Sequence, residues 1–292
     1  MIEAKAASIR IKHLLHIHRY ELAAEQLKEA LLLFPDDPDL LICQALYFDQ
    51  KGYKELALEA IEICLSKNYF KLEAALLRIE LLRNLKRYHE AEADILELIK
   101  LFPESSDLYT VYGWILLDVF QFEKSSKIIE EALRLDPNNP YALRCMVYSE
   151  ILVDGKKNTE EIVAKLIEHD PESTSNLYTL CARLLSEHKY KQASEVAQIL
   201  IRRSPNDQDL INLAIEAKVA GHLLNKPFMI LNKFGWAGSA GLWIGFIIIY
   251  QITKHNENSN LASSILIVYV SYCLLSWVIS PILKNWYTKR GI

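Results

Sequence analysis

A proline that returns at a fixed interval is the feature that most constrains how this chain can fold. Five prolines keep one phase: Pro35, Pro103, Pro137, Pro171 and Pro205. The first interval is 68 residues and each later one is 34, so one position of the series lacks its proline. A period of 34 residues is typical of a solenoid made of helix–turn–helix units. The sequence therefore predicts a helical repeat architecture.

Two further columns of residues keep the same phase. Small residues lie twelve positions before each phase point, at Ala23, Ala57, Ala91, Ser125, Thr159 and Ala193. Branched aliphatic residues lie four positions before it, at Leu31, Leu65, Ile99, Leu133, Ile167 and Ile201. A small residue lets two helices approach closely, and aliphatic residues at helical spacing form one apolar stripe. Proline then ends the second helix of each unit, because it lacks an N–H and disfavours helix in the residue before it.

The stretch DLYTVYGWILLDVFQFEKSSKIIEEALRLDPNN, residues 107–139, resembles the tetratricopeptide repeat. It has Tyr109, Gly113, Phe122, Ala132 and Pro137 at the signature positions of that repeat. The resemblance covers residues 4–207 as six units, at 4–37, 38–71, 72–105, 106–139, 140–173 and 174–207. It implies an all-α, right-handed superhelical solenoid of helix–turn–helix repeats.

An amphipathic segment, 208–225, follows the sixth unit. A solenoid needs a terminal element to cover its last apolar face, so we expect this segment to be a capping helix. The predicted domains are therefore a solenoid at 1–225 and a membrane anchor at 226–292.

Two uncharged stretches dominate the predicted anchor. Residues 234–252 and 261–283 contain 19 and 23 residues without a charge, and a transmembrane helix needs about 20. The sequence therefore predicts a transmembrane hairpin. Three small residues recur every four positions in the first span, at Ala237, Gly241 and Gly245. Such a face favours close packing of helices in lipid, and we expect its partner to be the second span rather than a second copy.

Charge is distributed unevenly along the chain. The net charge is −4, yet residues 226–292 contain six basic residues and one acid. The outer flanks of the two spans hold five of these basic residues: Lys226, Lys233, Lys284, Lys289 and Arg290. The connecting loop holds only Lys254, so the positive-inside rule places both termini and the repeats in the cytoplasm. The acidic remainder argues against a nucleic-acid surface.

The repeats combined with a basic-flanked hairpin and the motif SWVISPI, 276–282, resemble a group of bacterial repeat proteins that brings no assigned activity with it. This resemblance implies a location in the bacterial inner membrane.

Catalytic and metal-binding motifs are the next possibility to consider. His13, His16 and His18 lie close in sequence, but no acid or thiol is in register with them. The five cysteines include no C-x-x-C pair, and most fall in amphipathic helical patterns, which indicates buried thiols. We therefore predict no enzyme activity, no cofactor and no metal site. Two alternatives stay open: a metal-dependent module using these histidines, and an oligomeric pore or transporter subunit built from the hairpin.

The remaining candidate is a protein-binding groove. In the tetratricopeptide geometry, the first helix of each unit lines a concave surface through its second, fifth, ninth and twelfth residues. The candidates are Thr110, Trp114, Leu117, Tyr141, Arg144, Tyr148 and Tyr178. Aromatic residues with an arginine are frequent anchors of protein interfaces. The sequence thus favours a membrane-anchored scaffold or assembly factor with a protein or peptide partner. The alternative is that these aromatic residues only pack between neighbouring helices.

Overall fold

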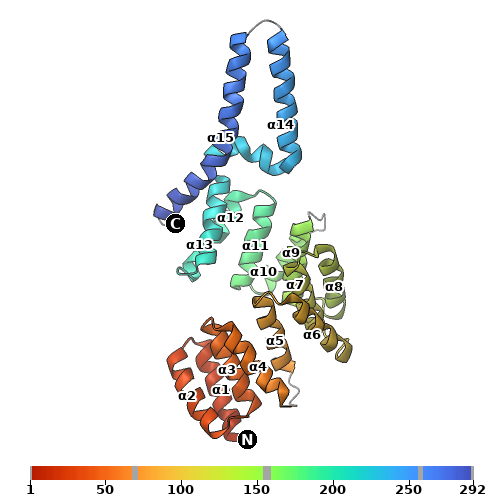
Figure 1. Cartoon of the computed structure of the whole chain (residues 1–292), viewed down its shortest axis with the longest axis vertical. Coiled ribbons are helices and arrows are strands. Elements are labelled where there is room, and N and C mark those ends of the chain that lie inside the picture. The colour runs from red at the N-terminus through yellow and green to blue at the C-terminus, as the bar shows by residue number, and fades with distance from the viewer. Residues whose placement is uncertain (1, 68–71, 154–158, 256–258, 291–292) are drawn as a thin grey trace. The chain divides into compact units, whose positions relative to one another are not determined.

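The computed structural model describes residues 2–67, 72–153, 159–255 and 259–290, and within these ranges all regular structure is helical (Figure 1). Six pairs of helices follow one another along the chain: α1 (Ile2–His16) with α2 (Tyr20–Leu33), α3 (Pro38–Gln50) with α4 (Lys54–Ser66), α5 (Leu72–Asn84) with α6 (Tyr88–Leu101), α7 (Ser106–Asp118) with α8 (Phe122–Leu135), α9 (Pro140–Val153) with α10 (Thr159–His169), and α11 (Thr174–Ser186) with α12 (Tyr190–Arg203). Each pair falls within one predicted unit apart from the first residues of α1, which confirms the prediction of an all-α repeat fold.

The period of 34 also fixes where the second helices begin. Tyr20, Lys54, Phe122 and Tyr190 open α2, α4, α8 and α12 at positions of the same phase. In the fifth unit the position of this phase, 156, lies outside the described residues, and α10 is described from Thr159.

Turns within the units share an unusual backbone conformation. One residue before the second helix lies in the left-handed region: His18, Gly52, Lys86, Phe120 and His188 have φ between 58° and 83°. These five positions again keep the 34-residue phase. Of these five described positions only the one in the second unit is glycine, so the other four hold side chains in a conformation that favours glycine.

A column of capping residues begins the first helix of several units. The carboxylates of Asp37 and Asp207 accept hydrogen bonds from the backbone N–H groups of α3 and of α13 (Gln208–Gly221), and the hydroxyl of Ser173 accepts one from α11. Asn139 has the same role at α9. Such caps satisfy N–H groups that otherwise have no partner within the helix. This column was not part of the sequence prediction, although short polar residues recur at its phase.

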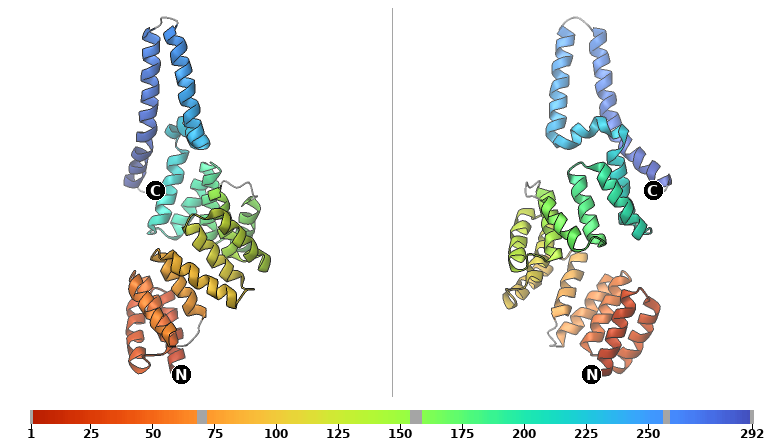
Figure 2. Two further views of the ribbon diagram at one scale, coloured as in Figure 1. Left: turned by 45° about the vertical axis from the view of Figure 1, so that its right-hand side comes forward. Right: turned by 180° about the vertical axis from the view of Figure 1, so that it is seen from behind.

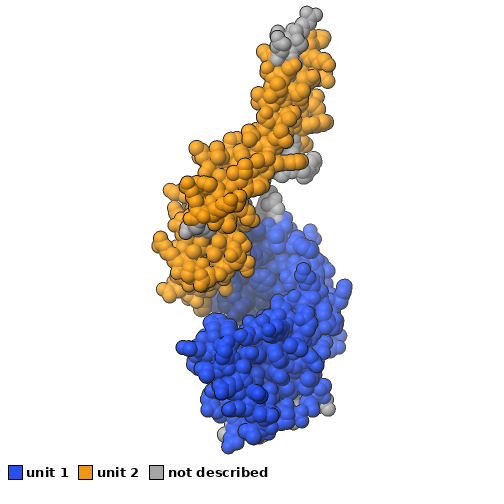
Figure 3. All heavy atoms as spheres, turned by 60° about the vertical axis from the view of Figure 1, so that its left-hand side comes forward, with its two compact units in different colours: residues 1–155 blue, residues 156–292 orange. Residues whose placement is uncertain are grey.

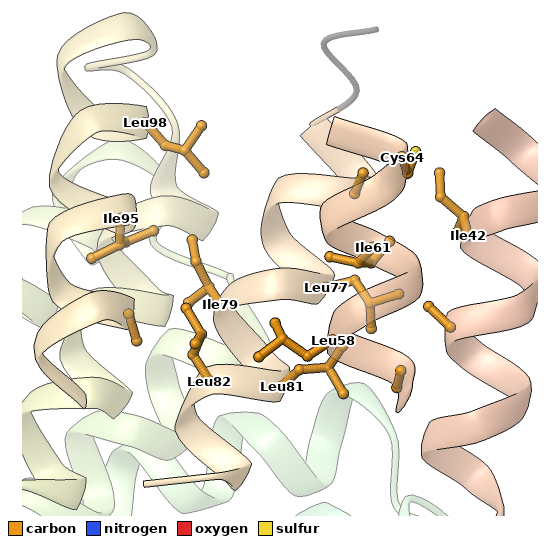
Figure 4. Packing of buried hydrophobic residues seen from close by; sticks show 14 of the residues in the cluster. Ile42, Leu58, Ile61, Cys64, Leu77, Ile79, Leu81, Leu82, Ile95 and Leu98 are labelled. Atoms are coloured by element: carbon orange, nitrogen blue, oxygen red, sulfur yellow. The ribbon is translucent and has the colours of Figure 1, made fainter. Parts of the chain in front are cut away.

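Of the two predicted columns, the small residues are buried, apart from the half-buried Thr159, and the branched aliphatic residues are half-buried and most of them pack against the core. In the close view of the α3–α6 region, Ile61 of α4 lies beside Leu77 of α5, and Ile79 of α5 faces α6, where Ile95 is buried (Figure 4). The helix α5 therefore packs on both of its neighbours. Burial of this stripe removes apolar surface from water, which is the main force holding successive helices together.

The chain forms two compact units, residues 1–155 and 156–292 (Figure 3). This division falls inside the fifth repeat, whereas the predicted domain boundary lies between residues 225 and 226. That boundary rests on composition alone and stays a prediction.

The second unit ends in a pair of long helices. After α13 a 3-10 segment, η1 (Leu223–Phe228), leads into α14 (Met229–His255) and α15 (Ser259–Arg290), which lie side by side (Figures 1 and 2). The rings of Phe246 and Tyr269 stack between them, with centroids 4.0 Å apart. The capping helix expected at 208–225 is present as α13, and its last predicted residues belong to η1.

One stretch of α15 has the length and composition to cross a membrane. Among the residues that the structure describes, Ser263–Arg290 is the stretch with this property, and its most apolar window has a mean hydropathy of 2.1. The first predicted span, 234–252, lies within α14, but the side chains of residues 229–237 are outside the described part of the structure.

The expected packing of the small-residue face on the second span is wrong for its glycines. A Cβ atom added to Gly241 or Gly245 would meet no atom within 4 Å, so neither glycine is in close contact with α15. The aromatic pair Phe246–Tyr269 separates two helices that we expected to meet through glycine. The side chain of Ala237 lies outside those described.

Candidate protein-binding surface

Two half-buried aromatic rings mark the candidate surface on the first unit. Trp114 of α7 and Tyr148 of α9 come from neighbouring helices, and their ring centroids are 5.6 Å apart at an interplanar angle of 53°. The two residues are 34 positions apart, so the repeat itself brings them together. Each ring keeps part of its face accessible to solvent. Large rings that are held in place and partly exposed lose little conformational freedom when a partner binds.

A cation–aromatic pair continues this surface along α9. The guanidinium of Arg144 lies over the ring of Tyr141, 4.5 Å from its centroid, and Tyr141 is 62% exposed. We name the four residues Trp114, Tyr141, Arg144 and Tyr148 the aromatic face. Rings together with an arginine are the side chains most often found at the energetic centre of interfaces.

Asn139 holds the beginning of α9 against α7. Its side-chain oxygen accepts hydrogen bonds from the N–H groups of Tyr141 and Ala142, at 3.0 and 3.2 Å. Its amide nitrogen donates to Ser106 Oγ at 3.0 Å and to Asp107 Oδ1 at 2.8 Å. Because Asn139 is only 3% exposed, these bonds form in a site from which water is largely excluded. They fix the separation of the two helices that carry the aromatic face.

An ion pair braces α5 against α7 near the same surface. Arg83 donates from Nε and Nη2 to Asp118 Oδ2, at 2.9 and 2.7 Å. Neither this ion pair nor Asn139 was predicted from the sequence. In the sequence, the pair could have been found only from the separation of Arg83 and Asp118, which is 35 residues and so close to one repeat period.

Three of the predicted groove residues do not join the aromatic face. Thr110 and Leu117 are 3% and 7% exposed, so their prediction as partner-binding residues is wrong. The hydroxyl of Thr110 donates to the carbonyl of Ser106 within its own helix, and Leu117 belongs to the buried core. Tyr178 is half-buried in the second unit, where it packs on the cluster of α11, α12 and α13.

The buried thiols have little nucleophilic character. Burial raises the pKa of Cys43, Cys145 and Cys181 to about 12. A thiol with so high a pKa has almost no thiolate at neutral pH.

The described residues were also expected to contain no metal site. Among the described residues, no group of three His, Cys, Asp or Glu side chains could hold a metal ion. His18, one of the three N-terminal histidines, is 2.7 Å from the hydroxyl of Tyr20 through Nδ1.

Comparisons with known proteins support the repeat assignment. The family model of the tetratricopeptide repeat matches residues 106–139, the unit that carries Trp114. No curated protein matches the chain.

Several solved structures share the fold at low sequence identity. The thermophilic TPR protein TTC0263 of Thermus thermophilus is 15% identical, with a TM-score of 0.57, and the match covers 62% of this chain and 98% of that one. PilF of Pseudomonas aeruginosa is 20% identical, with a TM-score of 0.54, and the match covers 73% and 97%. PilW, a type IV pilus biogenesis factor, is 15% identical, with a TM-score of 0.55, and the match covers 71% and 96%. The chain is therefore an all-α protein with the fold of a tetratricopeptide-repeat solenoid.

Proposed function

We propose that this protein is a membrane-anchored scaffold or assembly factor that binds a protein segment through its aromatic face. The observation that supports binding is the pairing of Trp114 with Tyr148 beside the Tyr141–Arg144 pair. A peptide or helix with an apolar anchor would bury these rings. The proposed partner is a protein, and its contact residues are Trp114, Tyr141, Arg144 and Tyr148.

Anchoring is the second part of the proposal. We propose two membrane spans, at about 234–252 and 261–283, with the repeats and both termini in the cytoplasm. The support is the apolar stretch Ser263–Arg290, the uncharged run within α14 and the excess of basic residues at the outer flanks. The repeat fold also supports a binding role, because scaffolds of this kind bind partner proteins and do not convert substrates.

Photo-crosslinking in membranes tests the binding surface. A crosslinking amino acid at position 141, where the native tyrosine is largely exposed, should capture a defined protein partner. Trp114→Ala and Arg144→Ala should each weaken binding of that partner by about thirtyfold, since loss of an anchor costs about 2 kcal/mol. The matched control is Phe120→Asn, which removes an 80% exposed aromatic residue from the turn of the same unit and should not affect binding.

Melting of the same variants separates binding from packing. If the rings only pack between helices, truncation should cost about 3–5 kcal/mol of stability. Unchanged capture of the partner by stably folded Trp114→Ala and Arg144→Ala variants would show that the aromatic face is not the binding site.

A carbonate wash of membranes tests the anchor. The full chain should stay in the membrane pellet, because the apolar helices are removed from water there. Release of the full chain into the wash would show that residues 226–292 bind the membrane surface and do not span the membrane.

A further inference from the structure

The last turns of α15 extend beyond its uncharged stretch and pack against the end of the solenoid. The helix has 32 residues, so it is about 48 Å long, whereas the hydrocarbon core of a bilayer is about 30 Å thick. Pro281 lies inside it, and the C-terminal part of α15 departs from the line of α14 (Figure 1). Beyond this proline, Leu283 is only 6% exposed. The C-terminal turns of α15 are therefore packed as part of the second unit.

Contacts with α13, its C-cap His222 and η1 hold these turns against the end of the solenoid. The ring of Tyr287 lies 6.2 Å from that of His222, and Lys218 Nζ lies 5.9 Å from its centroid. Two turns earlier, Ser280 Oγ donates to the side-chain oxygen of Asn225 at 3.4 Å. In these turns Leu283 is buried and Tyr287 is half-buried, whereas Lys284, Trp286, Lys289 and Arg290 are exposed.

The exposed side chains of these turns are mainly basic and aromatic. Lys284, Lys289 and Arg290 are exposed there, and the guanidinium of Arg290 lies over the ring of Trp286, 4.3 Å from its centroid. Lys226 of η1 is exposed as well. We name Lys226, Lys284, Trp286, Lys289 and Arg290 the basic collar. Three of its cations and its indole ring follow the uncharged stretch 261–283, and Lys226 belongs to η1, which contacts α15.

We propose that the basic collar binds the phosphate groups of anionic phospholipids at the membrane surface from which α15 emerges. The proposal rests on the proposed membrane anchoring. Clusters of lysine and arginine directly beside a transmembrane helix attract acidic lipid headgroups, and tryptophan favours the same interfacial depth. The partner is identified by charge complementarity: the collar is cationic, while the rest of the chain, residues 1–225, has an excess of acidic residues that the same lipids repel.

Lipid binding at this place has a consequence for the solenoid. Since Tyr287 is held by α13, a headgroup bound to Arg290 or Lys289 also fixes the orientation of the last repeat helix at the membrane. The basic collar would then orient the end of the solenoid at the membrane, in addition to holding the C-terminal segment there.

Native mass spectrometry of the full chain tests this proposal. The protein is reconstituted in nanodiscs of phosphatidylcholine mixed with phosphatidylglycerol, and the lipids that stay bound after release are counted. The parent should retain phosphatidylglycerol preferentially. The triple variant K284Q/K289Q/R290Q should lose this preference by at least about tenfold, since each cation near the surface contributes measurably to binding of anionic lipid.

Two controls make the outcome specific. K254Q removes one cation from the opposite end of the hairpin and should keep the preference, and so should K284R/K289R, which keeps the charge. Melting of the solenoid shows that each variant folds.

Each contrary result has a separate meaning. Failure of the full chain to enter nanodiscs would overturn the membrane anchor. Entry with equal retention of both lipids would overturn the basic collar alone, and would leave an acidic protein as the ligand of that patch. Displacement of phosphatidylglycerol by inorganic phosphate at matched ionic strength would overturn the assignment to a lipid surface.

Discussion

At the scale of single residues, substitutions at the left-handed turn positions measure the effect of backbone strain on stability without a change in side-chain contacts. Gly52 has φ of +83°, and a Cβ added there would meet no atom within 4 Å. Gly52→Ala should therefore destabilise its unit by about 1 kcal/mol through the backbone alone. Lys86 occupies the equivalent position one period later with φ of +61°. Lys86→Gly should leave stability nearly unchanged, because the relief of strain is offset by greater freedom of the unfolded chain.

Urea unfolding followed by circular dichroism measures both changes. Equal midpoints for the parent and Gly52→Ala would mean that the turn adjusts without cost.

The buried thiols give a second prediction at the residue scale. Burial raises the pKa of Cys43, Cys145 and Cys181 from 9.0 to about 12, so the folded state disfavours the thiolate. The stability linked to these groups is complete below pH 9 and decreases as the pH rises from 9 toward 12. At pH 8.5 the thiolate population is about a thousandfold lower than for an unperturbed thiol.

Alkylation with iodoacetamide, read by mass spectrometry, should modify these three cysteines only after urea unfolding. Native labelling at rates close to those in urea would refute the burial of the thiols.

At the scale of elements, the side chain of Asn139 both caps α9 and binds that helix to α7 through hydrogen bonds. Asn139→Ala removes the cap and two inter-helix hydrogen bonds, and should cost about 2–3 kcal/mol. Asn139→Asp keeps an oxygen that can cap the helix, but it replaces the donor that bonds Asp107 Oδ1 with a second acceptor. Repulsion between the two carboxylates should make this variant similarly unstable.

The double variant Asn139→Asp with Asp107→Asn restores a donor–acceptor pair, and it should recover most of the loss in urea midpoint. No recovery would indicate that the bond to Asp107 contributes nothing and that only the cap stabilises α9.

The helices themselves could be predicted from the sequence because each unit is local and repeats the same chemistry. Small residues such as Ala57 and aliphatic residues such as Ile99 recur in every unit, and a phased proline ends every unit except the second. The candidate surface was predicted less well. Thr110 and Leu117 share the predicted helix face of Trp114. Their burial depends on how closely the neighbouring helices approach, and the repeat period does not specify that distance.

At the scale of the whole molecule, the return of α15 to α13 could not be predicted from local patterns. The contact of Tyr287 with His222 joins residues 65 positions apart, and no repeat column relates them. The uncharged runs predicted the two long helices, but they did not indicate that α15 continues as a packed, basic segment.

Topology is the prediction that belongs to the whole molecule. Five of the six basic residues after position 225 flank the outer ends of the two uncharged stretches, and one, Lys254, is near the loop. Cytoplasmic loops carry such an excess of lysine and arginine, so a reporter fused after Ile292 should behave as cytoplasmic and one inserted near residue 258 as external. Changing the outer cations Lys284, Lys289 and Arg290 to glutamine should increase the fraction of inverted molecules, whereas Lys254→Gln should not. A cytoplasmic signal from both reporters in the parent would mean that the hairpin lies on the membrane or re-enters it. The aromatic face would then have to be presented by a peripheral protein.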